Sequence, residues 1–427
     1  MRKSMRFAAG VSAVVLTIGL AGCTAGEPED GDASSVTELN LPAVEAPWLG
    51  GYQAMVDLYE EETGITVNLT AFPFDGLRTQ EANAAQSGSN AFDLLLINEQ
   101  WVGQFYDNGW VQPVADVKPD FEWDEGLIQF DGIGRWDPDA RATTPDGEVY
   151  SLPINGNIHE FMYRTDLYDQ LGLDVPDDWE GVIDNAEAAR SAGAASNGYV
   201  VRGKTPSYDF SAVLYSYDGA WFADESGGDY TPTIDTDEFR EALEMFKALA
   251  DVGPAAPQTI AQAEAISLMQ GGDTLQATLV TASSVPLEDP AASLIAGKVG
   301  YAALPGGTPV SGVWTMGVPV GLPADRAAAA MDFLQWLTSQ ETMQAWADAG
   351  GVTTRTDVSS DRPELQVLIE SADAIRGGLR YPFTPAMLEV TDPALGLYLS
   401  GDVDLEATIT AIQSGLDRVV EEAGFSQ

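Results

Sequence analysis

The sequence predicts an α/β protein built as two lobes. The chain has 427 residues, more than a single hydrophobic core usually organises. Its N-terminal third alternates strand-like and helix-like segments, the arrangement that produces a parallel sheet flanked by helices. A mid-chain stretch combines two strand-like runs with a short polar segment, as expected of a crossing from one lobe to the other.

The N-terminal segment has the layout of a secretory signal. Three basic residues among the first six precede an apolar run at 7–20, which is short for a membrane span. The run ends in Leu-Ala-Gly-Cys, and this ending resembles the lipobox of bacterial lipoproteins, whose cysteine carries the lipid. We therefore expect a signal peptide at 1–22, lipidation of Cys23 and an acidic, flexible tether at 23–36.

Composition excludes several classes of function. The chain has 66 acidic and 20 basic residues and a formal net charge of -46, which disfavours a nucleic-acid partner. It contains one cysteine and one histidine, so it cannot form an internal disulfide and has few ligands for zinc. The acidic loop at 137–146 lacks the spacing of an EF-hand. We expect no metal and no cofactor.

The first third of the chain is expected to supply a parallel sheet. Strands are predicted at 37–46, 65–72 and 92–97, with helices at 52–62 and 75–87 and a loop at 48–51. Pro42 confines the first strand to an edge or shortens it, and Gly64 ends the first helix. Ligands of open α/β sheets bind beyond the carboxyl ends of strands, where Glu99 and Trp101 follow the third strand.

The mid-chain crossing consists of a strand at 149–153 and a strand-like run at 158–163, which flank a polar segment of Asn155, Gly156 and Asn157. Glycine and asparagine allow the backbone to bend. The two asparagine side chains either hydrogen-bond a ligand in a cleft or only satisfy the bent backbone. His159, the single histidine, is interpreted as a structural side chain rather than a ligand.

The second half of the chain contains mostly helical patterns. Helices are predicted at 177–192, 211–221, 239–252, 264–272, 326–339, 362–376, 385–400 and 404–423, strands at 198–202 and 299–305, and a return crossing at 312–321.

Several motifs resemble one family. The pattern G-x-V-Y-S-L-P at 147–153, followed by M-Y-R-T-D-L-Y-x-x-L-G-L at 162–173, is similar to the family 1 extracellular solute-binding proteins of sugar ABC importers. The similarity covers about 38–425. Further landmarks occur in the family's order: Pro176 with Trp179, Glu-Glu-Thr-Gly-Ile at 61–65, Gly-Val-Trp-Thr at 312–315, and Gly-Gly-Val-Thr-Thr-Arg at 350–355, where threonine replaces the family's proline.

This resemblance implies a fold and a function. The fold is a two-lobed periplasmic-binding-protein-like fold of type II, in which each lobe is a mixed sheet flanked by helices and a hinge joins the lobes. We expect lobe 1 at 37–154 and 312–355, and lobe 2 at 155–311 and 356–427. The implied function is that of a monomeric, lipid-anchored receptor outside the cytoplasm. It captures a sugar or sugar alcohol by hinge closure and delivers it to an ABC importer permease.

A receptor for such a ligand needs flat aromatic rings for the C–H faces and planar polar groups for the hydroxyls. For every candidate the alternative is a purely structural role, such as local packing or a salt bridge. The resemblance marks Trp221 and Trp314 as stacking positions, Glu99 as the ligand-binding acid and Arg355 as a cleft arginine. The full set of candidate ligand-binding residues is Trp48, Phe74, Asp75, Glu99, Trp101, Asn155, Asn157, Trp221, Trp314 and Arg355.

Two other functions stay open at this point. A secreted carbohydrate-active enzyme would need an acid and a nucleophile about 5 to 9 Å apart, but with this many acidic residues their presence alone argues nothing. No G-x-S-x-G elbow, P-loop or G-x-G-x-x-G after a strand occurs, so we expect no enzyme. A non-transport surface scaffold would be favoured by an aliphatic, closed cleft without Glu99 and Trp314 at its surface.

Overall fold

The computed structural model describes residues 36–425. Cys23, the expected signal peptide at 1–22 and all of the expected tether except Val36 lie outside the described residues. None of the helices in the described range combines the length and the apolar composition that crossing a bilayer requires.

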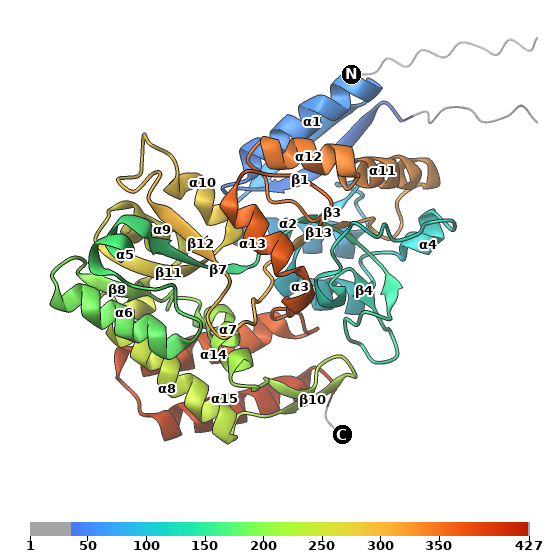
Figure 1. Ribbon diagram of the computed structural model, residues 1–427. Helices are drawn as coiled ribbons and strands as arrows, with labels where there is room; N and C mark the ends of the chain where they lie inside the picture. The colour runs from blue at the N-terminus through green and yellow to red at the C-terminus, as the bar shows by residue number, and fades with distance from the viewer. Residues whose placement is uncertain (1–35, 426–427) are drawn as a thin grey trace, which may run out of the picture. The chain divides into compact units, whose positions relative to one another are not determined.

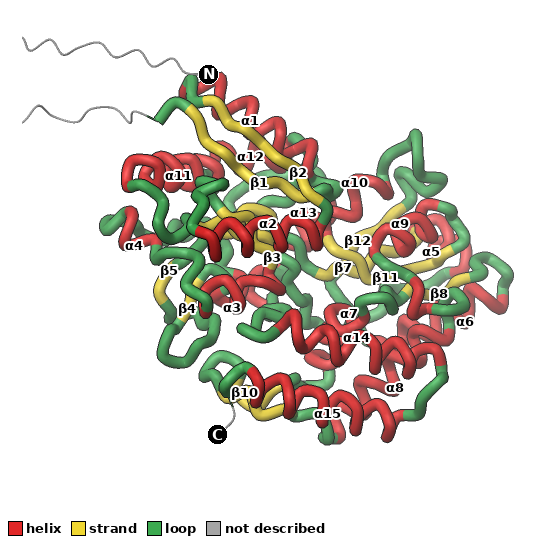
Figure 2. The backbone as a smooth tube through the Cα atoms, turned by 180° about the vertical axis from the view of Figure 1, so that it is seen from behind, coloured by secondary structure: helices red, strands yellow, loops and turns green. Residues whose placement is uncertain are grey.

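The strands of the first part of the chain lie in two small sheets, and the return crossing adds a strand to the second of them. β1 (Glu38–Val44) and β2 (Thr66–Phe72) pair in parallel, and Figure 1 and Figure 2 both show them beside α1 (Leu49–Thr63). The second sheet has the order β3 (Leu95–Asn98), β13 (Trp314–Gly317), β6 (Leu152–Asn155), with antiparallel pairs. The return crossing therefore lies between the third strand and the strand that leads into the mid-chain crossing.

Helix α1 begins earlier than the sequence suggests. The predicted loop at 48–51 is wrong, because residues 49–51 are helical and the helix ends at Gly64 with φ of 73°. Two adjacent glycines indicated a loop, but both lie in the first turn of α1. A Cβ at Gly51 would lie 3.4 Å from the Ala349 carbonyl oxygen and the Gly351 nitrogen, which is ordinary van der Waals contact.

The mid-chain crossing leads into a larger sheet. Its order is β12 (Val299–Ala302), β7 (His159–Arg164), β11 (Thr274–Val280), β8 (Asn197–Val200), and only the β11–β8 pair is parallel. Every residue of β11 is buried, and the sequence analysis did not predict this strand. The flanking helices are α5 (Thr165–Leu171), α6 (Trp179–Ser191), α9 (Gln262–Gln270) and α10 (Ser284–Leu287).

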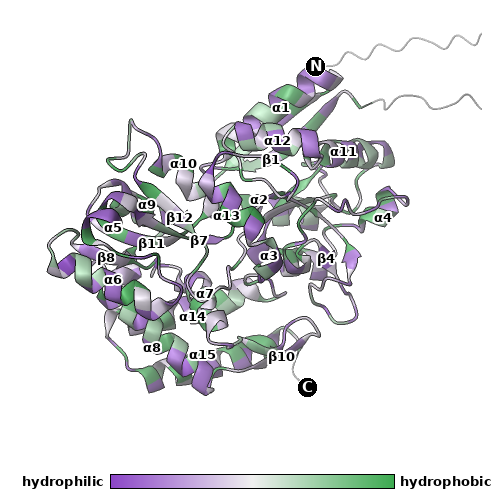
Figure 3. Cartoon of the chain, viewed as in Figure 1, coloured by the Kyte–Doolittle hydropathy of each residue, from purple (hydrophilic) through white to green (hydrophobic). Residues whose placement is uncertain are grey.

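Four helices form a layer beside this sheet: α7 (Pro206–Ser216), α8 (Asp237–Asp251), α14 (Thr384–Ser400) and α15 (Leu405–Glu422). The predicted helix at 211–221 is therefore shifted, since α7 starts at a proline that suits a first helical turn. Figure 3 shows hydrophobic and hydrophilic bands alternating along α8 and α15, as expected for helices with one buried face.

The remaining elements connect these layers. They are α2 (Phe74–Ser87), α3 (Glu99–Asp107), α4 (Val114–Val117), β4 (Arg135–Trp136), β5 (Glu148–Val149), β9 (Phe222–Asp224), β10 (Asp229–Pro232), α11 (Ala324–Leu337), α12 (Gln340–Asp348) and α13 (Pro363–Glu370), with four short 3₁₀ turns. The predicted helix at 362–376 is thus too long, because α13 ends at Glu370 and an irregular segment follows.

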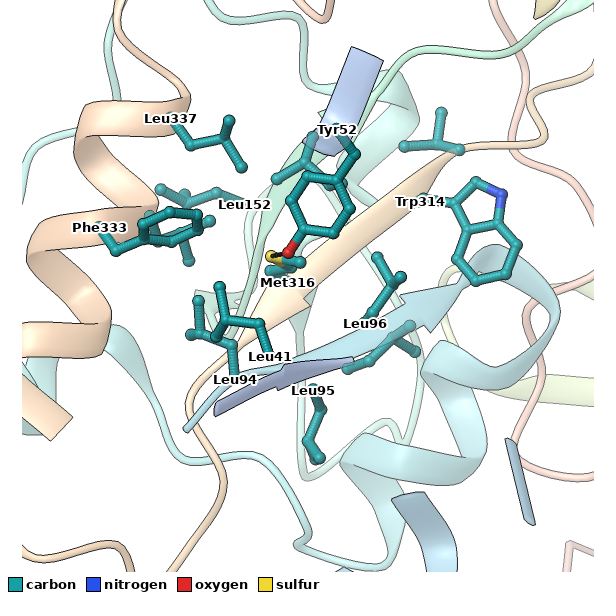
Figure 4. Close-up of a cluster of buried hydrophobic side chains, with 14 of the residues drawn as sticks. Leu41, Tyr52, Leu94, Leu95, Leu96, Leu152, Trp314, Met316, Phe333 and Leu337 are labelled. Carbon is teal, nitrogen blue, oxygen red and sulfur yellow. Dashed lines mark hydrogen bonds between the residues drawn. The ribbon is translucent and has the colours of Figure 1, made fainter. Parts of the chain in front are cut away.

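Two large hydrophobic clusters carry most of the buried apolar side chains. Figure 4 shows part of the first, where residues of β1, β3 and β13 meet α1 and α11: Leu41, Tyr52, Leu94, Leu95, Leu96, Leu152, Trp314, Met316, Phe333 and Leu337. The second cluster joins α7, α8, α14 and α15 and includes Phe210, Trp221, Phe239 and Leu416. Leu365 and Leu368 of α13 belong to the first cluster.

Candidate functional site

A cavity of about 430 Å³ lies where segments from both halves of the chain meet. From the first part of the chain, its walls come from the ends of β1 and β3 and the starts of α1 and α2. The two crossings, the region from β8 to α7, and α14 with the loop before it supply the other walls. The strand-end rule that predicted a site after β3 is therefore consistent with the position of this cavity.

One wall of the cavity is aromatic. Trp48, Phe74 and Trp314 line it. Trp48 directly precedes α1, Phe74 is the first residue of α2, and Trp314, shown in Figure 4, is the first residue of β13. The ring centroids of Trp48 and Trp314 are 5.8 Å apart. Trp101 supports the wall from behind, with its ring 4.7 Å from that of Phe74 and 5.4 Å from that of Trp314. The wall offers flat apolar surface for C–H faces.

Glu99 lies at the first residue of α3 and lines the cavity, although it is only 1% exposed. Its Oε1 accepts hydrogen bonds from the Ser311 hydroxyl at 2.6 Å and the Gly378 amide at 2.7 Å, and its Oε2 accepts one from the Val313 amide at 3.2 Å. Burial raises the pKa of Glu99 to about 7 despite these bonds and the nearby Arg380. Since each carboxylate oxygen can accept about two bonds, Oε2 keeps capacity for a ligand hydroxyl.

The two asparagines of the mid-chain crossing are placed differently. Asn157 lines the cavity and its Oδ1 accepts a hydrogen bond from the Ala282 amide at 3.0 Å, which leaves its amide nitrogen as a donor. Asn155 is fully buried, opposite Trp314 in the sheet, and does not line the cavity. Neither polar atom of its side chain has a hydrogen-bond partner among the described residues.

Besides Trp101 and Asn155, three more of the candidate residues do not line this cavity. Trp221 is buried in the second cluster, 5.5 Å from Phe210 and 5.4 Å from Phe239 between ring centroids, and its indole N–H donates to Ser211 at 2.9 Å. Asp75 is exposed in the first turn of α2. A match to a family position gave no information on which way the side chain of Trp221 points.

Arg355 is the third of these residues, and it has a structural environment. Its buried guanidinium forms ion pairs at 2.7 Å with Asp124 and with Asp357, and it donates to the Thr338 carbonyl at 3.0 Å. These partners raise the pKa of Arg355. The arginine therefore fastens the segment after α12 to the loop at 124, which is the salt-bridge alternative of the sequence analysis.

Arg202 lines the cavity but was not a candidate in the sequence analysis. It is the second residue after the end of β8, so the rule that found Glu99 applies to it as well. Its Nε donates to Asp209 at 3.0 Å, its Nη1 donates to Gln262 at 3.1 Å, and its Nη2 lies 2.8 Å from Nε2 of His159. Burial lowers the pKa of His159, so this ring is neutral and accepts from Arg202. The histidine is a structural partner, as predicted.

Tyr208 on α7 was also missed. Its ring lies 4.2 Å from the ring of His159, and its buried hydroxyl lines the cavity without a hydrogen-bond partner among the described residues. A Cβ at Gly312 would lie 2.3 Å from this hydroxyl oxygen. The return crossing therefore needs glycine at 312 for Tyr208 to reach the cavity, and no signal in either residue alone reveals this pairing.

The ionisable side chains that line the cavity are mostly acidic. Among the described residues that line it, Arg202 carries the one positive charge, and this charge is paired with Asp209. The lining acids are Glu45, Glu99 and Asp392, and burial raises the pKa values of Glu99 and Asp392. In the part of the chain that the structure describes, no three metal-ligating side chains come together in a group that could hold a metal ion.

Known proteins resemble the chain in sequence and structure. A putative binding protein of Brucella abortus is 25% identical over 264 residues, and this alignment spans 60% of each protein. The mannitol-binding protein of Pseudomonas aeruginosa is 23% identical over 375 residues, which cover 80% of this chain and 83% of that protein.

Solved structures resemble the fold. Maltose-bound MalE3 of T. maritima superposes with a TM-score of 0.75 at 20% identity, covering 89% of this chain and 99% of that one. This likeness confirms the expected two-lobed periplasmic-binding-protein-like fold. The family model of bacterial extracellular solute-binding proteins matches residues 54–372. The chain therefore belongs to the bacterial extracellular solute-binding protein family, as the motifs at 147–173 indicated.

Proposed function

We propose that this protein is the receptor of an ABC importer for a sugar or a sugar alcohol. One observation carries the proposal: the cavity has an aromatic wall of Trp48, Phe74 and Trp314 together with the hydrogen-bonding groups of Glu99 and Asn157. Aromatic faces and planar polar groups are the two surfaces that a polyhydroxyl compound matches. The mannitol and maltose named for the similar proteins belong to this class.

The charges of the cavity favour an uncharged ligand. An anion would approach Arg202, whose charge Asp209 already compensates, while Glu99 and Asp392 would repel it. A cation would find Glu99 held in hydrogen bonds to the protein and with a raised pKa. The volume of about 430 Å³ falls within the range of about 300 to 1,000 Å³ typical of small-molecule sites.

We propose that binding proceeds by hinge closure between lobe 1 (37–154 and 312–355) and lobe 2 (155–311 and 356–427). Two crossings meet at the cavity, since the Gly312 amide donates to the Asn157 carbonyl at 2.8 Å. At Gly156, a Cβ would lie 2.2 Å from the Thr353 carbonyl oxygen, so only glycine fits this close approach. Small residues at both crossings suit a hinge.

The remaining parts of the proposal follow from the sequence. Cys23 would carry a lipid that anchors a monomeric receptor on the outer face of the membrane, and the closed form would deliver its ligand to the permease. We propose no catalytic activity. The scaffold alternative expected a cavity without Glu99 and Trp314, whereas both residues line it.

A thermal-shift screen tests the proposal. The chain from residue 36 onward is tested with hexitols, tetritols, mono- and disaccharides, amino acids and peptides. A ligand at about 100 times its Kd adds about 2.7 kcal/mol of stability and raises Tm. Trp314→Ala should abolish the shift, whereas Trp336→Phe, on α11 outside the cavity, should retain it. Stabilisation only by non-carbohydrates would contradict the proposed ligand class, and no stabilisation by any compound would contradict the receptor function.

A further inference from the structure

A second cavity, of about 280 Å³, shares a wall with the first. The segment 376–381 contributes to both cavities: Leu379 lines the first, whereas Arg376, Arg380 and Tyr381 line the second. The other walls of the second cavity come from the loop at 131–145 and from residues 220–230 around β9 and β10. The two cavities have no lining residue in common, so the second is a separate site.

The donors of the second cavity come from the shared segment. The guanidinium of Arg376 lies 3.6 Å above the ring of Tyr215 and forms no ion pair within the described residues. Arg380 is paired with Asp131 at 2.7 Å and also donates to the Phe130 carbonyl at 3.3 Å. The hydroxyl of Tyr381 is buried, the residue is 3% exposed, and this hydroxyl lies beside Glu225 and the Tyr215 hydroxyl. Burial raises the pKa of Tyr381, and both of these neighbours raise it further.

Glu225 supplies an acceptor to the same cavity. Its carboxylate is buried beside the hydroxyl of Tyr381. Burial raises the pKa of Glu225, and the positive charges of Arg376 and Arg380 act in the opposite direction. Asp224 also lines this cavity. The cavity therefore presents a half-buried guanidinium without an ion pair among the described residues and, near it, a carboxylate that interacts with Arg376, Arg380 and Tyr381.

We propose that the second cavity binds a small zwitterion of the α-amino-acid type, with its carboxylate on Arg376 and its ammonium group on Glu225. The Tyr381 hydroxyl would donate to the same ligand carboxylate. Phe222, Tyr230 and Tyr381 also line this cavity, with ring centroids 4.8 to 5.7 Å apart, and their apolar surface suits a short apolar side chain.

Ligands with one kind of charge fit this cavity less well. A simple anion would satisfy Arg376 but would be repelled by Glu225, Asp224 and Asp131. A simple cation would meet the two arginines. A zwitterion satisfies both kinds of group at once and does not change the net charge of the cavity.

The test uses thermal shift and titration calorimetry with glycine, L-alanine and L-serine. Sodium acetate and methylammonium chloride at equal ionic strength represent each charge alone, and D-mannitol represents a neutral polyol. We expect an amino acid to raise Tm more than either single ion does. Arg376→Gln and Glu225→Gln should each weaken its binding at least tenfold. The matched control Arg190→Gln, an exposed residue at the end of α6, should leave that binding unchanged.

Two further variants separate the sites. Binding of the amino acid should persist in Trp314→Ala, and any carbohydrate shift should persist in Arg376→Gln, which also shows that this variant is folded. The inference fails if no amino acid binds, if acetate alone binds as well, or if amino-acid binding survives Arg376→Gln. Amino-acid binding that Trp314→Ala abolishes would place the ligand in the first cavity, and would contradict both this inference and the proposed ligand class.

Discussion

Glu99 should make the stability of the fold depend on pH between about 5 and 8. Burial raises its pKa from 4.5 to about 7 in the folded protein. A folded-state pKa above the unfolded value means that the folded form binds the proton more tightly. The resulting stabilisation is fully present below the unfolded pKa and is lost as the pH rises through the folded pKa.

The size of the effect follows from the shift. A difference of about 2.5 pKa units corresponds to about 3 kcal/mol, at about 1.4 kcal/mol per unit. Between pH 5 and pH 8, about 2.5 kcal/mol of this contribution should be lost. Solvent screening reduces this free-energy contribution of Glu99 only slightly, since Glu99 is 1% exposed.

Glu99→Gln isolates this contribution. Every other acid titrates in both proteins, so the difference between their free energies of unfolding reports Glu99 alone. Urea denaturation at pH 5, 6, 7 and 8 should show the variant gaining stability relative to the parent protein by about 2.5 kcal/mol across this range. Stability curves that run parallel with pH would refute the claim that Glu99 is buried with a raised pKa.

Three further predictions concern packing and pairing. Gly312→Ala should cost about 1 to 3 kcal/mol of stability in urea denaturation, because its Cβ would lie 2.3 Å from the Tyr208 hydroxyl oxygen. Adding Tyr208→Phe should restore part of the loss. An equal loss in the double variant would argue against this contact. Arg355→Met should lower Tm through the loss of two ion pairs, yet leave the carbohydrate Kd unchanged in calorimetry, and a large rise in Kd would return Arg355 to the ligand site. Trp221→Ala should cost about 3 to 5 kcal/mol of stability by emptying space in the second cluster, with ligand affinity of the folded protein retained; a selective loss of affinity would contradict its place in the core.

The first strand-helix-strand unit could be predicted because its signals are local, whereas the third predicted strand pairs antiparallel with β13 in another sheet. Strand, helix and glycine follow one another at 37–72, and β1, α1 and β2 occur there. Strand β11 was missed although its sequence, Thr-Leu-Gln-Ala-Thr-Leu-Val, alternates polar and apolar residues. This alternation does not mark a solvent-exposed face, because β11 lies between two other strands and all of its residues are buried.

The ligand-site candidates also differ in whether a local sequence pattern or only tertiary contacts determine the position of the side chain. A position directly after a strand identified Glu99 and, nearby, Trp101, because strand ends of one sheet share an edge. Applying the same rule to β8 would have identified Arg202. By contrast, Trp221 and Arg355 were chosen by family position. The direction of each side chain depends on tertiary contacts with Phe210 and with Asp124 that no local pattern reveals.

Titration calorimetry of the sugar or polyol that stabilises the chain most in the thermal-shift screen tests the proposed receptor function. We expect one binding site per chain, binding abolished by Trp314→Ala and unchanged binding in Trp336→Phe. Absence of binding heat for every carbohydrate, or full affinity in Trp314→Ala, would contradict the claim that the cavity beside Trp314 and Glu99 is a carbohydrate receptor site.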